Sequence, residues 1–367
     1  MLNARAFYPI GLNFTFSTQM NIKDIVNRNI AQLSNCDEEP IHVPGSVQPH
    51  GCLLAVTPDT YSIQFCTANV VDLFELPPAQ ILEHSLTDIW PEAKEAIVSN
   101  LANPQLKDKS VSLLIGSKPV NLLVHQANGL VLLELEKEIT AEESQISLFD
   151  QTKEFITLIE RSRSLQQLCQ RIADQTRRIT GYDRVMIYRF DKNYNGEVYA
   201  ESKRRDLEPL LGLHYPHTDI PTQARQLYLR QQLRLIPDVG YEPSPLLTLK
   251  KTDHTAIDMS DVGIRSVSPL HIQYLKNMEV GGTLTISLLL EGKLWGLIAC
   301  HHQKPKYLSL AQRQAAMMQG HFLTSQIRVQ QVAEEYEVNV NVEAHLQQSL
   351  AKIEGEEDFE LKFEQFA

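Results

Sequence analysis

The segment from residue 40 to residue 51, PIHVPGSVQPHG, restricts the fold of this chain more than any other part of it. Its three prolines and two glycines exclude a helix and impose extended or turn geometry. Short apolar runs after it predict strands at 52–56, 63–67, 111–115 and 130–135 and helices at 70–76 and 91–100. The first part of the chain is therefore predicted to be a mixed α+β domain.

A second domain is expected because 367 residues exceed the usual size of one domain. After a polar, acidic join at 136–147, apolar positions at helical spacing predict a helix over 155–180, and a strand is predicted at 184–190. A hairpin is expected over 279–302 and a helix over 308–332, followed by an acidic tail from 354. The segment 207–268 is too long for a simple connection, so we expect it to be functional.

Charge and composition exclude several classes of protein. The 34 Lys and Arg against 45 Asp and Glu give a net charge of −11, so binding of nucleic acid through a basic field is not expected. No apolar run approaches the roughly 20 residues that cross a bilayer, and the N-terminus lacks a secretory pattern, so we expect a cytoplasmic protein. The five cysteines are odd in number and form no CxxC pair, which argues against a disulfide scaffold and a zinc knuckle.

Strand alternation in 283–288, TLTISL, puts three leucine or isoleucine side chains on one face and three hydroxyls on the other. The apolar side chains are Leu284, Ile286 and Leu288, and the hydroxyls are Thr283, Thr285 and Ser287. The hydroxyl face either meets water or lines a polar pocket, and His301 ends the partner strand nearby.

Two further segments carry candidate ligand-binding residues. In 211–225, two prolines bracket a turn that presents Asp219, and a helix is predicted to run on through Arg225, Tyr228 and Arg234. The forked guanidinium groups of Arg225, Arg234 and Arg265 suit carboxylates, although each arginine alone is typical of a surface ion pair. His271 and Tyr274 start another helix. With Tyr188, Tyr215 and His301 they indicate a pocket for a flat conjugated ligand that bears acidic groups.

Four motifs together resemble the chromophore-binding region of bacterial phytochromes. They are PIHVPGSVQPHG at 40–51, PHTDIP at 216–221, SVSPLHIQYL at 266–275 and LWGLIACHH at 294–302. The resemblance implies a PAS domain followed by a GAF domain, each an antiparallel sheet with flanking helices, joined by a figure-of-eight knot and followed by a long exit helix. It divides the chain into an arm at 1–30, a PAS domain at 31–142, a GAF domain at 143–325, and an exit helix with an acidic tail at 326–367.

The resemblance also implies a cofactor, biliverdin, held by a thioether from Cys36 to a vinyl group of ring A. Plant and many cyanobacterial members instead carry the cysteine just before the histidine of the GAF motif, where this chain has Leu270. The pigment is therefore expected to be biliverdin and not phycocyanobilin or phytochromobilin. The attachment is expected to be autocatalytic.

The remaining roles are carried over by motif. Asp219 and His271 would contact the pyrrole nitrogens, and His301 the ring-D carbonyl. Arg234 and Arg265, with Thr283 and Thr285, would hold the propionates. The other expected pigment contacts are a tyrosine cage of Tyr188, Tyr215 and Tyr228, together with Ile220, Pro221, Ser268 and Tyr274.

The implied function is red/far-red photoreception with Z/E isomerisation of the bridge between rings C and D, and the implied assembly is a homodimer through the GAF domain and exit helices. No enzymatic activity is expected, since no kinase motif occurs in the chain. The chain ends near where a third family domain would begin, so it is expected to be a fragment or a short relative that lacks its output domain and photoconverts incompletely. His217 and Thr218 replace the usual Ala-Ser, and Glu279 replaces a frequent Gly, which bears on spectral tuning.

Three alternatives stand beside this interpretation. A Cys/His enzyme that used Cys300 with His301 is disfavoured because adjacent strand residues point to opposite faces, and the same geometry disfavours a haem or metal site at His301 and His302. The other Cys/His candidate is Cys36 with His42. A PAS–GAF dimerisation or sensory module without pigment stays open.

Overall fold

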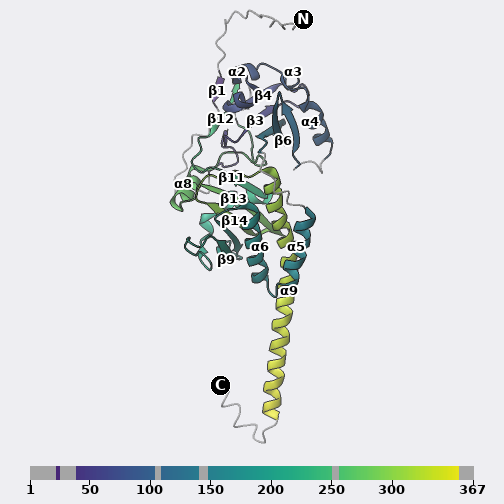
Figure 1. The fold of residues 1–367 in the computed structure, drawn as a ribbon, viewed down its shortest axis with the longest axis vertical. Coiled ribbons are helices and arrows are strands. Elements are labelled where there is room, and N and C mark those ends of the chain that lie inside the picture. The colour runs from purple at the N-terminus through teal and green to yellow at the C-terminus, as the bar shows by residue number, and fades with distance from the viewer. Residues whose placement is uncertain (1–21, 25–38, 104–108, 140–147, 250–255, 355–367) are drawn as a thin grey trace, which may run out of the picture.

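The computed structural model describes residues 22–24, 39–103, 109–139, 148–249 and 256–354. In this part of the chain two antiparallel sheets form two successive domains, and a long helix leads away from the second (Figure 1). The predicted α+β class is confirmed. None of the helices in these ranges is long and apolar enough to cross a membrane.

The first domain is built on strands that the sequence largely predicts. They are β3 (Gly51–Val56), β4 (Ile63–Thr67), β5 (Val111–Ile115), β6 (Lys118–Ala127) and β7 (Leu130–Lys137). Strand β6 is not among the strands predicted from the sequence. One face of this sheet is covered by η2 (Ala68–Val70), α1 (Val71–Phe74), α2 (Pro78–Ile81), α3 (Leu86–Ile89) and α4 (Ala93–Ala102). A capping box between Ser85 and Asp88 starts α3 and leads to Trp90, which is buried in this core.

The other face of the first sheet is covered by a segment from the second half of the chain. Strand β12 (Ser244–Leu249) pairs with β4, with β1 (Ile22–Asp24) and with β2 (Ser46–Val47), so it extends the sheet (Figure 1). Farther along, four apolar side chains pack against the sheet: Ile257, Met259, Val262 and Ile264. The segment 207–268 is thus partly regular structure, and the arm at 1–30 contains a strand.

The second domain has the strand order β10-β9-β8-β14-β13-β11. The strands are β8 (Arg184–Phe190), β9 (Gly196–Lys203), β10 (His214–Tyr215), β11 (Leu233–Ile236), β13 (Gly282–Leu290) and β14 (Lys293–His302). The predicted strand at 184–190 and the predicted hairpin are confirmed. Helices α5 (Leu148–Glu160), α6 (Leu165–Thr180) and α9 (Leu310–Glu354) cover one face. The shorter α7 (Thr222–Arg230) lies against β13 and β14, and α8 (Pro269–Asn277) follows β12 in the chain.

Three predicted helices differ from those observed. The helix at 155–180 is two helices, because Ser164 accepts a bond from the Gln167 N–H (3.2 Å) and caps a new helix there. The helix through Arg225 and Tyr228 ends at Arg230, so Arg234 lies instead on β11. The exit helix α9 is 45 residues long and passes well beyond residue 332.

An ion pair joins the first domain to α9. Glu136 is buried on β7, and its carboxylate accepts two bonds from the Arg313 guanidinium (3.0 and 2.7 Å). The predicted polar join at 136–147 is wrong at its start, because Glu136 belongs to β7. Paired donors and acceptors of this kind are the strong form of an arginine–carboxylate contact. The start of the exit helix is therefore fastened to the first sheet.

Candidate functional site

The hydroxyl face of β13 is largely covered by protein, and its central residue Thr285 is half-buried. Thr283 and Ser287 are buried, and the Ser287 hydroxyl donates to the carbonyl of Tyr228 on α7 (2.8 Å). Leu284, Ile286 and Leu288 lie in the core on the opposite face, as the alternation predicts. Of the two interpretations left open by the sequence, the structure therefore argues against a face that meets water.

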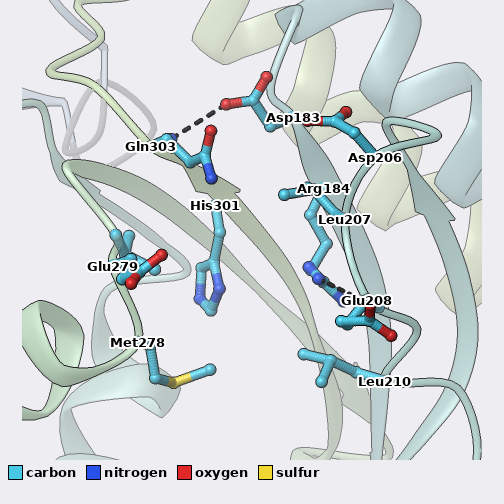
Figure 2. Close-up of a pocket in the computed structure, with 11 residues that line it drawn as sticks. Asp183, Arg184, Asp206, Leu207, Glu208, Leu210, Met278, Glu279, His301 and Gln303 are labelled. Atoms are coloured by element: carbon cyan, nitrogen blue, oxygen red, sulfur yellow. Dashed lines mark hydrogen bonds between the residues drawn. The ribbon is translucent and has the colours of Figure 1, made fainter.

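His301 points from the end of β14 into a cavity of about 420 Å³ (Figure 2). Met278 and Glu279 lie on one side of the imidazole, and Arg184, Glu208 and Leu210 on the other. Burial, with the nearby Arg184 and His271 adding to its effect, lowers the pKa of His301 to about 4. The imidazole is therefore neutral near pH 7, with one nitrogen as donor and the other as acceptor.

His302, the next residue, serves a different set of contacts. Its Nδ1 lies 2.9 Å from the carboxylate of Asp183, and its ring packs edge-on against Tyr182 with centroids 5.9 Å apart. In the described part of the chain no group of three or more His, Cys, Asp and Glu is placed to hold a metal ion. The expectation that strand geometry separates the two histidines is met.

His271 lies on α8, where Ser268 caps the helix by accepting from the Leu270 N–H (3.2 Å). Its ring stacks on Tyr274, with centroids 6.1 Å apart. Burial, with the charge of Arg234 second, lowers the pKa of His271 to about 4, so this imidazole is also neutral at pH 7. Burial, with the charge of Asp219 second, raises the pKa of Tyr274 to about 12.

Tyr188, Tyr215 and Asp219 form the next part of the site. The rings of Tyr188 and Tyr215 are 6.0 Å apart, and Asp219 ends the short turn His217–Asp219 (η4) that Ile220 and Pro221 follow. Burial raises the pKa of Tyr188, and Asp219, Tyr274 and Tyr215 raise it further in that order. Burial likewise raises the pKa of Asp219. These groups are thus close enough to affect one another's protonation.

Gly196 on β9 allows the Tyr188 ring to lie where it does. A Cβ atom at this position would stand 1.8 Å from Cζ of Tyr188. No side chain larger than hydrogen fits there without displacing the ring.

Arg234 and Arg265 are buried, and Arg234 pairs in register with Thr285 of the hydroxyl face, whose side chain bonds to the half-buried Tyr228. Arg234 donates to the carbonyls of Gly263 and Arg265 (2.5 Å each), and Arg265 donates to the side-chain oxygen of Gln231 (2.5 Å) and to the Val262 carbonyl (3.1 Å). Burial lowers the pKa of both arginines. Burial raises the pKa of Tyr228, while a hydrogen bond with Thr285 and the two arginines oppose the rise.

This grouping refines the predicted roles. The structure brings Tyr228 together with the arginines and Thr285, apart from the pair formed by Tyr188 and Tyr215. Arg225 instead stacks over Tyr194 (4.5 Å from the ring centroid) and donates to the carbonyl of Ile220 (2.5 Å). Arg225 therefore supports the turn that carries Asp219.

Cys36 lies outside the described residues, but its neighbour Glu39 lies within them. The Glu39 carboxylate accepts a 2.6 Å bond from the Ser268 hydroxyl, at the start of α8. The other four cysteines, Cys52, Cys66, Cys169 and Cys300, are buried free thiols. Burial raises the pKa of Cys66 and of Cys169 to about 12, so neither is a ready nucleophile.

Arg184 lines the cavity although it is not among the predicted site residues. It forms a buried ion pair with Glu201 and donates to the carbonyl of Glu208 (2.7 Å) beside the cavity. The signal was present: Arg184 and Tyr188 stand at even spacing on β8 and so share its face.

This chain is similar to known proteins in both sequence and fold. The profile described as PAS fold matches residues 36–138, and that of the GAF domain matches 164–326. Cyanobacterial phytochrome B of Nostoc sp. is 35% identical over 93% of this chain, and a bacteriophytochrome of Pseudomonas aeruginosa is 38% identical over 75%. The chain spans 46% and 38% of those proteins' own lengths.

A solved structure, the chromophore-binding domain of Stigmatella aurantiaca phytochrome P1, superposes with a TM-score of 0.73 at 35% identity. The match covers 80% of this chain and 99% of that one. This chain thus matches nearly the whole of that chromophore-binding domain in both fold and sequence.

Proposed function

Since this chain belongs to the phytochromes and corresponds to their PAS–GAF chromophore-binding region, we propose that it covalently binds biliverdin and senses red and far-red light. The single observation that carries this proposal is the set of groups around the hydroxyl face of β13. Two buried arginines, two neutral imidazoles and a cluster of tyrosines converge there. A flat tetrapyrrole with two carboxylates offers partners to all of them.

Each part of the site fits one part of that pigment. The Arg234 and Arg265 guanidinium groups would hold the propionates, helped by the hydroxyls of Thr283 and Thr285. The neutral imidazole of His301 would donate to the ring-D carbonyl. Asp219 and His271 would face the pyrrole nitrogens. Bound biliverdin would supply the light absorption and the Z/E isomerisation of the bridge between rings C and D.

The remaining contacts are apolar or aromatic. They are Tyr188, Tyr215, Tyr228, Tyr274, Ile220 and Pro221. We propose that these side chains exclude water from the ring system and set its orientation, while Ser268 acts through its bond to Glu39.

Cys36 is proposed as the attachment residue on two grounds. It precedes Glu39 by three residues, a span of at most about 11 Å of chain, and Glu39 is bonded to Ser268 at the start of α8. The other four thiols are buried, and their pKa values are raised, chiefly by that burial. With Leu270 where other family members carry the cysteine, we propose biliverdin as the pigment.

The signal is proposed to pass through β13 to α9. Thr285 faces the site on this strand, and the adjacent Ile286 faces the core, where a Cβ added to Gly320 of α9 would be 2.8 Å from its Cγ2. Because α9 lies this close to Ile286, a small shift of the strand is proposed to move the helix. The PAS–GAF portion itself is proposed to have no catalytic activity.

The domain boundaries at 30, 142 and 325 and the knot also remain proposals. The pairing of β12 with β1 and β2 supports the knot, because it brings the 207–268 segment against the N-terminal strands. A homodimer through the second domain and α9 is supported by exposed apolar side chains on that helix. They are Val329, Val332, Tyr336, Val340, Leu346 and Leu350.

Reconstitution tests the proposal. Purified apoprotein mixed with biliverdin should gain red absorbance, and a denaturing gel soaked in zinc should show a fluorescent band. Cys36→Ser should abolish the band while binding persists. A colourless mixture would refute pigment binding and favour a pigment-free sensory module, and a band retained in Cys36→Ser would refute the attachment residue.

A further inference from the structure

Glu134 is a buried carboxylate of the first domain that reaches the second. It lies on β7 with 2% of its surface exposed, and it accepts bonds from the backbone N–H groups of Gly263 (2.9 Å) and Ile264 (3.0 Å). The Nε2 of His125 donates to the same carboxylate (2.8 Å). Burial alone would raise the pKa of Glu134, but the His125 bond and charge and the Gly263 N–H together lower it. The group is therefore held as an anion.

The loop that Glu134 holds is the loop that organises the arginine pair. Its N–H groups at Gly263 and Ile264 face Glu134, while its carbonyls at Gly263 and Arg265 accept both bonds from the Arg234 guanidinium. The next residue after Ile264 is Arg265 itself. A shift of the carboxylate is therefore expected to move the carbonyls that hold Arg234 and the backbone of Arg265.

The approach between strand and loop depends on a glycine. A Cβ atom on Gly263 would lie 2.8 Å from Oε1 of Glu134 and 3.1 Å from Nε2 of Gln231. Gln231 in turn accepts a bond from Arg265 (2.5 Å). No methyl group fits between these partners without moving one of them, so the contact is a tight one.

The charges of Glu134 and of the two arginines also support this link. Arg234 and Arg265 are buried side by side, and each has Glu134 among the groups that stabilise its charged form. Asp261 also acts on Arg265, but it already accepts a bond from Arg230 (2.8 Å). Two guanidinium charges beside one shared carboxylate leave an excess positive charge, which a ligand carboxylate would neutralise.

We propose that Glu134 is a positioning residue for the anion-binding arginines, so that the first domain completes the ligand site of the second. The inference rests on the proposed function, since it takes the arginines to bind the propionates of biliverdin. It assigns to the first domain a role in ligand affinity through a carboxylate that touches no ligand.

The test compares biliverdin with its dimethyl ester, which lacks both free carboxylates. Reversible binding is measured by red absorbance in the full chain carrying Cys36→Ser. Glu134→Gln should weaken biliverdin binding by about tenfold or more, and the ester by less than about twofold. The matched control is Glu136→Gln, on the same face of the same strand, which loses the Arg313 pair and should change the ratio of the two affinities little.

A second variant guards against loss of folding in Glu134→Gln. Gly263→Ala keeps the carboxylate but separates it from the loop, and it should show the same selective loss for the diacid. Equal losses for both ligands, or no loss for either, in these two variants would overturn the inference alone. If the parent chain bound neither ligand, the proposed function would fail, and the inference would fail with it.

Discussion

The hydroxyl of Ser268 donates a 2.6 Å hydrogen bond to the carboxylate of Glu39, across 229 positions of sequence. Ser268 caps α8, the helix of His271 and Tyr274, and Glu39 follows the proposed attachment residue by three positions. The bond therefore ties the N-terminal segment to the helix that bears part of the site.

Removing this tie should slow pigment attachment. Because positioning of a nucleophile contributes strongly to its rate, Glu39→Ala should attach biliverdin roughly tenfold more slowly, with reversible binding retained. The rate is read from the zinc-fluorescent band over time. Ser268→Ala should show the same slowing and lose about 1 kcal/mol of stability with its helix cap. The exposed Glu83→Ala is the control, and an unchanged rate in Glu39→Ala would contradict the role of the tie.

Gly196→Ala should displace the Tyr188 ring. The added methyl group would overlap the ring, since Cζ lies 1.8 Å from the Cβ position, and overpacking of this kind costs about 1 to 3 kcal/mol. Thermal unfolding measures the cost, and the absorbance of the biliverdin complex reports the altered site. In a Tyr188→Ala background the same change should cost little. A full cost there would show that the ring is not the obstacle.

The stability of the apoprotein should fall as the pH falls from 7 to 5. His271 and His301 have pKa values of about 4, below the ordinary 6.5, so the unfolded chain takes up protons first. Stability from the neutral imidazoles is full above the unfolded pKa and declines as pH drops toward the folded one, by about 1 to 2 kcal/mol per group between pH 7 and 5.

Denaturant unfolding at the two pH values measures this slope. The double variant His271→Gln and His301→Gln should have a shallower slope. It lacks two imidazoles that take up protons in the unfolded chain but stay neutral in the native state over this pH range. His50 and His302, whose pKa values are also lowered, chiefly by burial, persist in that variant and leave a residual slope. An identical slope in parent and variant would show that the two site histidines are not held neutral.

The exposed face of α9 should bring two copies of the chain together. Val329, Val332 and Tyr336 repeat at intervals of three and four residues, and Leu346 and Leu350 continue the same stripe. Tyr336→Glu or Leu346→Glu should convert a dimer to a monomer in sedimentation experiments. Val338→Glu is the matched control, because Val338 is equally exposed but lies on the opposite side of the helix. A dimer that survives both stripe substitutions would exclude α9 as the interface.

The candidate site was predictable wherever a local pattern carries the information. Alternation in 283–288 correctly separated the core side chains from Thr283 and Thr285, because successive residues of a strand point to opposite faces. The motifs around Asp219, His271 and His301 were predictable because each lies in a short continuous segment of sequence. Arg184 lay within reach of the same rule and was overlooked.

A local sequence pattern does not reveal which distant residue a side chain will contact. The alternation on β7 marks Glu134 and Glu136 as sharing one face, and polar residues on a strand face ordinarily meet water. Only the tertiary structure covers that face with the 257–264 segment and with Arg313 of α9, and so converts two apparent surface carboxylates into buried anchors. The sequence thus determined which face of its strand each side chain lies on. The tertiary structure decided which groups the side chain contacts, because burial and pairing depend on segments that are far apart in the sequence.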